Sequence, residues 1–166
     1  DRMNGGGNVS PMIIERLHRE VYRMNMYRNG SEGLATIPES THHGPKVCLV
    51  DKYSSSDGDL FPYGFQKLGI GPLIGTRTWG GIVGISGSKP YVDGQDVRTP
   101  FFTSYSTDGK WILENEGVTP DIYVDINPFE DYLGNDAQLK KAVEVLLEQI
   151  KTYPQLPGVP KPRVMD

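Results

Sequence analysis

The sequence lacks the features that define several large classes of protein. Its 166 residues include a single cysteine, Cys48, so no disulfide can form within the chain and a cysteine zinc cluster is excluded. No apolar run approaches the roughly 20 residues of a membrane span, and the best candidate, 46–50, has the length of a strand. The net charge of −4, without a basic stripe, argues against a nucleic-acid partner. These absences favour an ordinary globular domain in which Cys48 is a small buried hydrophobe.

Apolar periodicity in the first half predicts helices and strands in alternation. Ser10-Pro11 and the apolar residues after it predict a helix over 11–22, whereas the polar, aperiodic stretch 24–44 is expected to be a long loop. Strands are predicted at 46–50 and 73–76, on either side of a helix that ends at Gly69, and this order predicts parallel pairing. Because Pro62 is tolerated best in a first turn, we expect that helix to begin near Asp59 or to have a distorted first turn.

The second half is expected to contain more short strands. Residues 77–110 combine β-branched and aromatic side chains with glycine turns, which predicts hairpins. Further strands are expected at 111–114 and 122–126, before a final helix capped by Asn135 or Asp136. The fold class is therefore α/β. We expect one domain over 1–153 and an extended tail over 154–166, where prolines recur.

Ser56 is the leading candidate for a nucleophile. It follows an apolar strand and precedes a helix, a position where a hydroxyl is exposed and helical amides face it. The alternative is structural, since Ser56 and Asp59 also match the S-x-x-D pattern of a helix cap. The three histidines, His18, His42 and His43, all precede Ser56, and each is typical of a solvated surface residue. A base must come from one of them or from outside the chain.

Three further segments carry residues suited to a catalytic site. The run Gly5-Gly6-Gly7 precedes a helix start and can offer amides to a ligand, although a tight connection would have the same sequence. It does not match a dinucleotide fingerprint or a P-loop. Glu114, on a predicted strand, either orients a hydrogen-bond network or faces solvent. Residues 79–81 (Trp-Gly-Gly) form either an adaptable rim or a turn with an aromatic anchor.

Four motifs together resemble the catalytic core of the tricorn-type serine peptidases, a branch of the C-terminal-processing peptidases. In chain order they are 1–7 (DRMNGGG), 56–59 (SDGD), 75–81 (GTRTWGG) and 114–121 (ENEGVTPD). Each is weak alone, but in this order they span nearly the whole chain apart from the tail. The resemblance implies a Clp-protease/crotonase-like fold of stacked strand-strand-helix units with additional hairpins. It also implies hydrolysis of peptide bonds with neither a cofactor nor a metal.

The same resemblance implies a role for each motif. Ser56 would be the nucleophile, and the amides of Asp57 and Gly7 would form the oxyanion hole, with Gly6 as the alternative to Gly7. Glu114 would support a catalytic histidine through an intervening serine. Substrate would be contacted by the residues that surround the nucleophile, namely Gly6, Trp79, Gly80 and Gly81.

One part of the family pattern has no counterpart in this chain. Nothing in residues 1–55 matches the His-bearing segment, which in the family precedes a PDZ-like insertion, and no lysine occupies 79–81. We therefore expect a fragment whose His base lies upstream, as its start at Asp1, without Met or signal peptide, also indicates. Its partners would be peptides, upstream segments including a PDZ-like domain and β-propellers, and further copies in a homo-oligomer. The acid that selects basic side chains in the family would be Glu20, Glu32 or Glu39.

Two other functions are compatible with these residues. A peptide-binding pseudoenzyme would keep the oxyanion architecture without cleaving its ligand. A crotonase-like acyl-CoA enzyme would use two backbone amides and need no nucleophilic serine. The Ser56 motif and Glu114 favour the peptidase over the acyl-CoA enzyme. A histidine preceded by a serine in the upstream sequence would separate the peptidase from the pseudoenzyme. By the resemblance the compartment would be the cytoplasm, with a secreted or periplasmic location also open.

Overall fold

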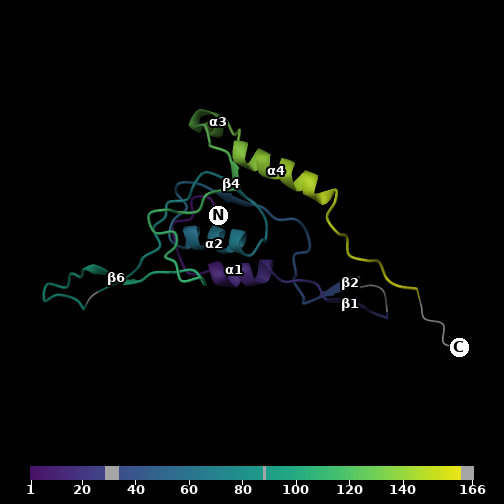
Figure 1. Ribbon diagram of the computed structural model, residues 1–166, viewed down its shortest axis with the longest axis horizontal. Helices are drawn as coiled ribbons and strands as arrows, with labels where there is room; N and C mark the ends of the chain where they lie inside the picture. The colour runs from purple at the N-terminus through teal and green to yellow at the C-terminus, as the bar shows by residue number, and fades with distance from the viewer. Residues whose placement is uncertain (29–33, 88, 162–166) are drawn as a thin grey trace.

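A three-stranded parallel sheet lies at the centre of the computed structural model, which describes residues 1–28, 34–87 and 89–161 (Figure 1). Its strands are β3 (Cys48–Val50), β4 (Leu73–Gly75) and β7 (Ile122–Tyr123), with β4 in the middle. Cys48 pairs with Leu73, and Ile74 pairs with Ile122. The parallel pairing expected around 46–50 and 73–76 is confirmed, and the fold is mixed α/β.

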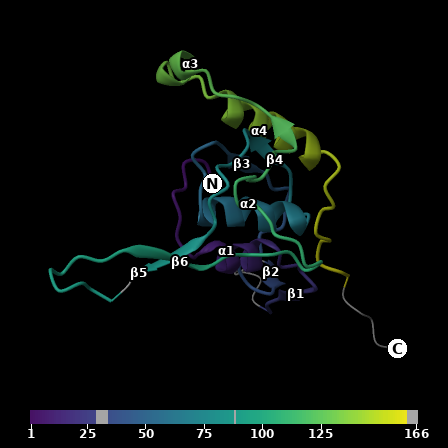
Figure 2. The same ribbon diagram turned by 60° about the vertical axis from the view of Figure 1, so that its left-hand side comes forward.

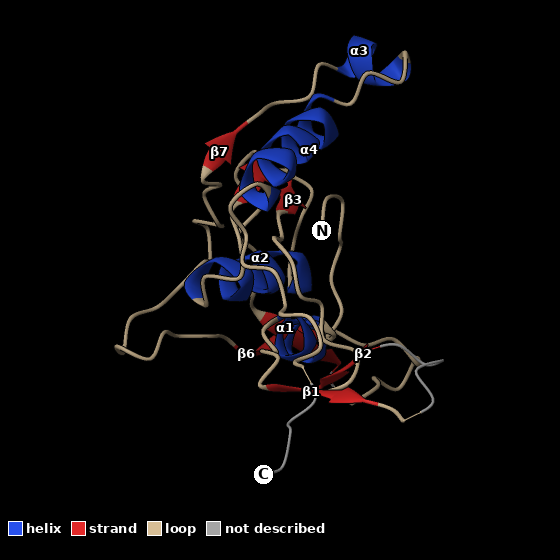
Figure 3. Ribbon diagram, turned by 90° about the vertical axis from the view of Figure 1, so that its right-hand side faces the viewer, coloured by secondary structure: helices blue, strands red, loops and turns tan. Residues whose placement is uncertain are grey.

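Helices cover both faces of this sheet. The helix α2 (Asp57–Lys67) packs on one face, α4 (Ala137–Ile150) on the other, and α1 (Ser10–Leu17) lies on the outer side of α2 (Figure 3). The close approach of α1 and α2 depends on Gly64, because a Cβ there would lie 2.4 Å from Cδ1 of Ile14.

The core lies between α2 and the sheet and continues into the loops beside them. Its buried members are Cys48, Val50, Phe65, Leu73, Ile82, Leu113 and Val118. Cys48 is 4% exposed, and burial raises the pKa of its thiol. A neutral, buried thiol is a poor nucleophile, so the interpretation of Cys48 as a small hydrophobe is confirmed.

Two antiparallel hairpins extend from this body. The strands β5 (Gly84–Gly87) and β6 (Arg98–Phe102) form a long arm, which confirms a hairpin within 77–110 (Figure 2). The strands β1 (Arg23–Met26) and β2 (Leu34–Ile37) form another, so the expectation of a loop throughout 24–44 was wrong. Backbone pairing stabilises β1 and β2, and the polar–apolar alternation of β1 (RMNM) covers only four residues, which is too short a signal to predict a strand.

Four predicted elements need correction. The first helix ends at Leu17 rather than near residue 22. Residues 111–114 do not form the predicted strand, since Trp111 makes only an isolated bridge with Tyr105 and a turn begins at Glu114. The predicted strand 122–126 is reduced to β7. The second helix begins at Asp57 rather than Asp59, so Pro62 lies inside it. Proline removes one backbone donor there, and the cap at Ser56 stabilises the first turn.

The other predicted helix ends are confirmed. Gly69 has a φ of 64°, and hydrogen bonds of 3.0 Å from Ile70 N–H to the Phe65 carbonyl and from Gly69 N–H to Gln66 complete a Schellman end of α2. Asp136 caps α4 by accepting the Leu139 N–H at 2.9 Å. A short helix, α3 (Pro128–Tyr132), precedes it and is capped by Asn127. The last five residues of the expected tail lie outside the described chain, as does Glu32.

Candidate active site

Ser56 caps α2 in the connection from β3. Its φ of 58° and ψ of −114° place a non-glycine residue in a strained region of backbone space. Its N–H donates to Oδ2 of Asp59 at 2.9 Å, and the two residues form a capping box. Ser56 therefore occupies the N-cap position, and Asp59 accepts its backbone N–H. A sharp, strained strand-to-helix turn is also the geometry that exposes a nucleophilic hydroxyl, so the capping role and a catalytic role are compatible.

The glycine run crosses directly over this turn. Gly6 has a φ of 127°, and a Cβ built on it would lie 3.4 Å from Ser56 Oγ. A Cβ on Gly7 would lie 3.9 Å from Asp57 Oδ2. The Gly6 N–H donates to Oδ1 of Asn4 at 3.2 Å, whereas in the described part of the chain no hydrogen bond engages the N–H of Gly7 or of Asp57. The glycine run and the Ser56 motif, which lie about 50 residues apart in the sequence, therefore meet at this turn.

Three buried carboxylates hold distant backbone segments around Ser56. Asp51 accepts the Met3 N–H at 3.1 Å, Asp57 accepts the Val9 N–H at 3.0 Å, and Asp59 accepts the Gly80 N–H at 2.8 Å. None of the three is more than 5% exposed. Amide donors compensate buried carboxylates without a cation, and each such bond is stronger than a neutral one.

Two of these anchors, Asp51 and Asn4, carry no local signal in the sequence. Asp51 directly follows a predicted strand, and Asn4 lies within the glycine motif, but nothing local indicates what either would contact. Asn4 accepts the Ser55 N–H through its carbonyl at 2.8 Å. A Cβ on Gly58 would lie 2.4 Å from that same oxygen, so only glycine fits there.

The Trp79-Gly80-Gly81 segment borders the same turn. It follows β4, and since β3 and β4 are parallel, the segments after both leave the same edge of the sheet. The Trp79 N–H donates to the Ser54 carbonyl at 2.9 Å, while its ring is 61% exposed and lies against Gly81. The predicted rim residues and Ser56 are therefore brought together.

Glu114 lies in the turn that follows Leu113. Its Oε2 accepts the N–H groups of Ile82 and Val83 at 2.8 and 3.1 Å, and the side chain is half-buried. These bonds connect Glu114 to the two residues that follow Gly81. Glu114 is therefore neither a strand residue nor a free surface acid.

The three histidines lie far from Ser56. His18, His42 and His43 line one pocket of about 420 Å³, beside Leu68 and Tyr153 at the C-terminal end of α2. Ser56 lies at the other end of that helix, whose 11 residues span about 16 Å. His42 and His43 are exposed, as expected, and His43 Nε2 is 2.8 Å from the Pro154 carbonyl. None of the three can act as a base for Ser56 in this arrangement.

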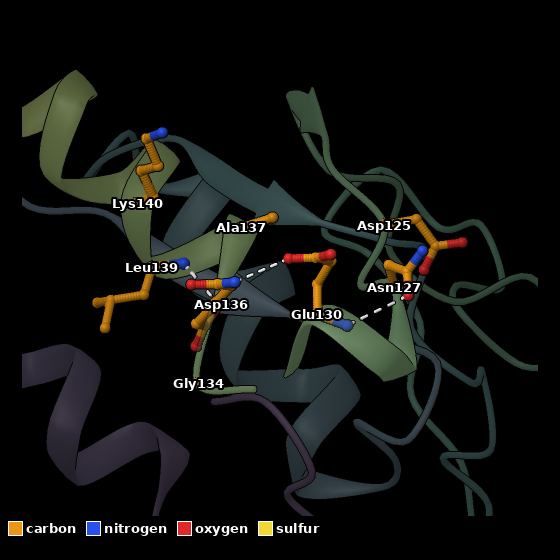
Figure 4. Close-up of a pocket in the computed structure, with 9 residues that line it drawn as sticks. Asp125, Asn127, Glu130, Gly134, Asp136, Ala137, Leu139 and Lys140 are labelled. Atoms are coloured by element: carbon orange, nitrogen blue, oxygen red, sulfur yellow. Dashed lines mark hydrogen bonds between the residues drawn. The ribbon is translucent and has the colours of Figure 1, made fainter. Parts of the chain in front are cut away.

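One further cavity lies away from the predicted site residues. A pocket of about 600 Å³ lies between α3 and the start of α4 (Figure 4). Its polar groups largely bond one another, as Asn135 Nδ2 does to Glu130 Oε2 at 2.8 Å. Over the described ranges, no three His, Cys, Asp or Glu side chains are grouped so as to hold a metal ion. Within those same ranges, no helix has the length and hydropathy of a membrane span.

Known proteins are similar to this chain in both sequence and fold. Residues 2–124 match the profile of Peptidase family S41. The chain is 38% identical to the Tricorn protease of Thermoplasma acidophilum over 161 residues, 95% of this chain and 15% of the relative. Against Tricorn protease homolog 1 of Streptomyces coelicolor it is 34% identical over 161 residues, covering 94% of this chain and again 15% of the relative.

Solved structures agree with these relatives. The crystal structure of the tricorn protease superposes with a TM-score of 0.85 at 38% identity, over 92% of this chain and 15% of that one. The photosystem II D1 C-terminal processing protease shares the fold, with a TM-score of 0.54 at 22% identity, over 87% of this chain and 37% of that one. The chain thus spans about 15% of the length of the tricorn relatives it matches. It belongs to peptidase family S41.

Proposed function

We propose that this chain carries the nucleophile and the oxyanion site of a serine peptidase that hydrolyses oligopeptides. The observation that carries the proposal is the strained Ser56 turn, with Gly6 placed so that its Cβ would lie 3.4 Å from Ser56 Oγ. Membership of a peptidase family supports it. Residues 1–153 form the catalytic core, on a Clp-protease/crotonase-like fold, and 154–166 form a tail.

The oxyanion donors are the amides of Asp57 and Gly7. Asp57 is the first residue of α2, where a free N–H and the positive end of the helix dipole favour an anion. Gly7 is preferred to Gly6 because Asn4 already accepts the Gly6 N–H. One such donor lowers the barrier of acyl transfer by about 3 kcal/mol.

The reaction then follows the chemistry of a serine nucleophile. Ser56 Oγ attacks the peptide carbonyl carbon, its proton passes to a base, and the oxyanion accepts hydrogen bonds from Asp57 and Gly7. The base returns the proton to the leaving amine as the C–N bond breaks. Water then attacks the Ser56 ester, and the proton it loses restores the hydroxyl.

The base is a histidine that residues 1–166 do not supply. The chain's own three histidines lie a helix length away from Ser56. An upstream segment of the same polypeptide, with a PDZ-like domain and β-propellers beyond it, would bring the base, and Glu114 would orient it through a serine. Trp79, Gly80 and Gly81 border the site and would contact the peptide together with Gly6, in an assembly of several copies.

A fluorophosphonate probe tests this proposal in the complete protein that contains this chain. Mass spectrometry of the adduct is expected to locate it on Ser56, with loss of labelling and of peptide cleavage in Ser56→Ala. The matched control is Ser55→Ala, one residue away and half-buried, which should label normally. Circular dichroism and thermal unfolding establish that the variants are folded.

Each alternative predicts a different result. A folded protein that binds peptide without labelling at Ser56 would be a peptide-binding pseudoenzyme, and the proposal would be wrong. Normal turnover in Ser56→Ala would place the nucleophile elsewhere, or indicate a crotonase-like reaction that needs only the amides.

A further inference from the structure

The carboxylate of Asp57 caps a helix to which Asp57 does not belong. Its Oδ2 accepts the N–H groups of Val9 and Ser10 at 3.0 and 3.1 Å, and its Oδ1 accepts the Ser10 hydroxyl at 2.5 Å. The side chain is 2% exposed, and across the described residues no Lys, Arg or His forms an ion pair with it.

The start of α1 depends on this contact. Val9, at the N-cap position, provides no side-chain hydrogen bond, and the Ser10 hydroxyl is turned to Asp57. A helix start is normally satisfied by a side chain of its own N-cap residue. Here the acceptor comes from a residue 47 to 48 positions later.

The same contact fixes one end of the glycine run. At the other end, the Asn4 carbonyl accepts the Ser55 N–H at 2.8 Å. Residues 5–8 are therefore held between two anchors that both belong to the turn containing Ser56. The conformational freedom of three consecutive glycines would otherwise leave the Gly7 amide unplaced.

We infer that Asp57 is a positioning residue for the oxyanion site, an inference that rests on the proposed function. Its backbone N–H is one donor, and its carboxylate holds the segment that carries the other donor, Gly7. Asp57 and the residues that it contacts directly therefore determine the distance between the two donors. The negative charge is compensated by two amides, a hydroxyl and the N-terminal end of α1.

Asp57→Asn in the complete protein tests the inference. The isosteric amide keeps the shape, and its oxygen can still accept the N–H groups of Val9 and Ser10, but the negative charge that strengthens these bonds is lost and the Ser10 hydroxyl must change from donor to acceptor. Displacement of Gly7 by about 1 Å is expected to lower kcat about 100-fold, with KM changed less than about 2-fold because the rim is untouched. Inhibition by a peptide boronate, whose tetrahedral oxygen occupies the oxyanion site, should weaken in parallel with kcat/KM.

The matched control is Asp121→Asn. Its carboxylate accepts the Leu73 N–H at 2.7 Å at the start of β4, the sheet edge opposite Ser56. This variant should lose stability while keeping kcat and boronate affinity. Equal kcat in Asp57→Asn and wild type, or equal losses in both variants, would overturn the inference.

A milder variant, Ser10→Ala, can test the inference if Asp57→Asn does not fold. Ser10→Ala removes one of the three contacts and leaves both amides, so we expect a loss of kcat of about 3- to 10-fold with KM retained. An unchanged kcat would count against the inference. Failure of the proposed function is distinguishable, because the wild-type protein would then show no fluorophosphonate adduct on Ser56.

Discussion

Asp59 and Gly80 are joined by a hydrogen bond of 2.8 Å between a carboxylate oxygen and a backbone N–H. The other oxygen of Asp59 accepts the N–H groups of Ser56 and Gly81 at 2.9 and 3.1 Å. One fully buried side chain therefore links the turn after β3 to the turn after β4. Three backbone N–H groups around Ser56 thus share one acceptor side chain, and such acceptors offer direct experimental tests.

Replacement of Asp59 by asparagine should weaken this link. One neutral oxygen would replace an anion that accepts three amides, so we expect a loss of about 2 kcal/mol in the free energy of unfolding. Fluorophosphonate labelling should slow about 10-fold as Ser56 loses its anchor. Urea unfolding and labelling rates measure both effects. Asp93→Asn is the control, since Asp93 is exposed and its carboxylate accepts the Gln95 N–H of its own turn. Equal stability of the two variants would contradict the prediction.

A methyl group on Gly6 should block the site. Gly6→Ala adds a Cβ 3.2 Å from the Ser56 Cβ at a φ of 127°, which together should cost about 1–3 kcal/mol and displace the hydroxyl. We expect cleavage to fall at least about 100-fold. Gly5→Ala is the matched control, because nothing lies within 4 Å of its Cβ. Similar activities for both variants would show that the glycine run does not border the reacting group.

Glu114→Gln separates an electrostatic role from a structural one. The glutamine oxygen can still accept from Ile82 and Val83, so we expect stability within about 1 kcal/mol of wild type. Loss of the charge that orients a histidine should lower kcat about 10- to 100-fold with KM retained. Single-turnover acylation rates provide the measurement. Glu116→Gln, at an exposed neighbouring position, should be neutral, and a neutral Glu114→Gln would leave this acid with its structural contacts alone.

The Arg2–Asp136 pair should make stability depend on pH. Arg2 contacts Asp136 through two nitrogens, at 2.6 and 2.9 Å, and this hydrogen bonding holds the pKa of Asp136 below its usual range. A depressed carboxyl pKa stabilises the fold above the unfolded pKa of about 3.9, and this contribution is lost as pH falls through the folded value.

Asp136→Asn should accordingly be less stable than wild type at pH 7, by about 1 kcal/mol. The difference should shrink below about pH 4 as the wild-type carboxyl is protonated. Thermal unfolding between pH 7 and 3 provides the measurement. Glu144→Gln, on the exposed side of the same helix, is the control. A pH-independent difference between Asp136→Asn and wild type would assign the effect to packing.

The local sequence was sufficient to predict features that depend only on residues nearby in the chain. The cap at Asp136, the end of α2 at Gly69 and the strands around 48–50 and 73–75 were all predicted, because caps, left-handed glycines and buried apolar runs act within a few residues. The four motifs and their order were likewise visible. The helix start at Asp57 was missed because the rule against Pro62 outweighed the cap at Ser56.

The tertiary structure decided how these motifs meet. Asp57 reaches Val9 across 48 positions, Asp59 reaches Gly80 across 21, and Glu114 reaches Ile82 across 32. A buried carboxylate accepts any correctly placed amide, and backbone amides carry no sequence signature, so no periodicity indicates such partners. The sequence by itself determined which groups could react, and only the folded backbone determined which of them lie together, because long-range amide-to-carboxylate bonds form once the sheet has brought their segments to one edge.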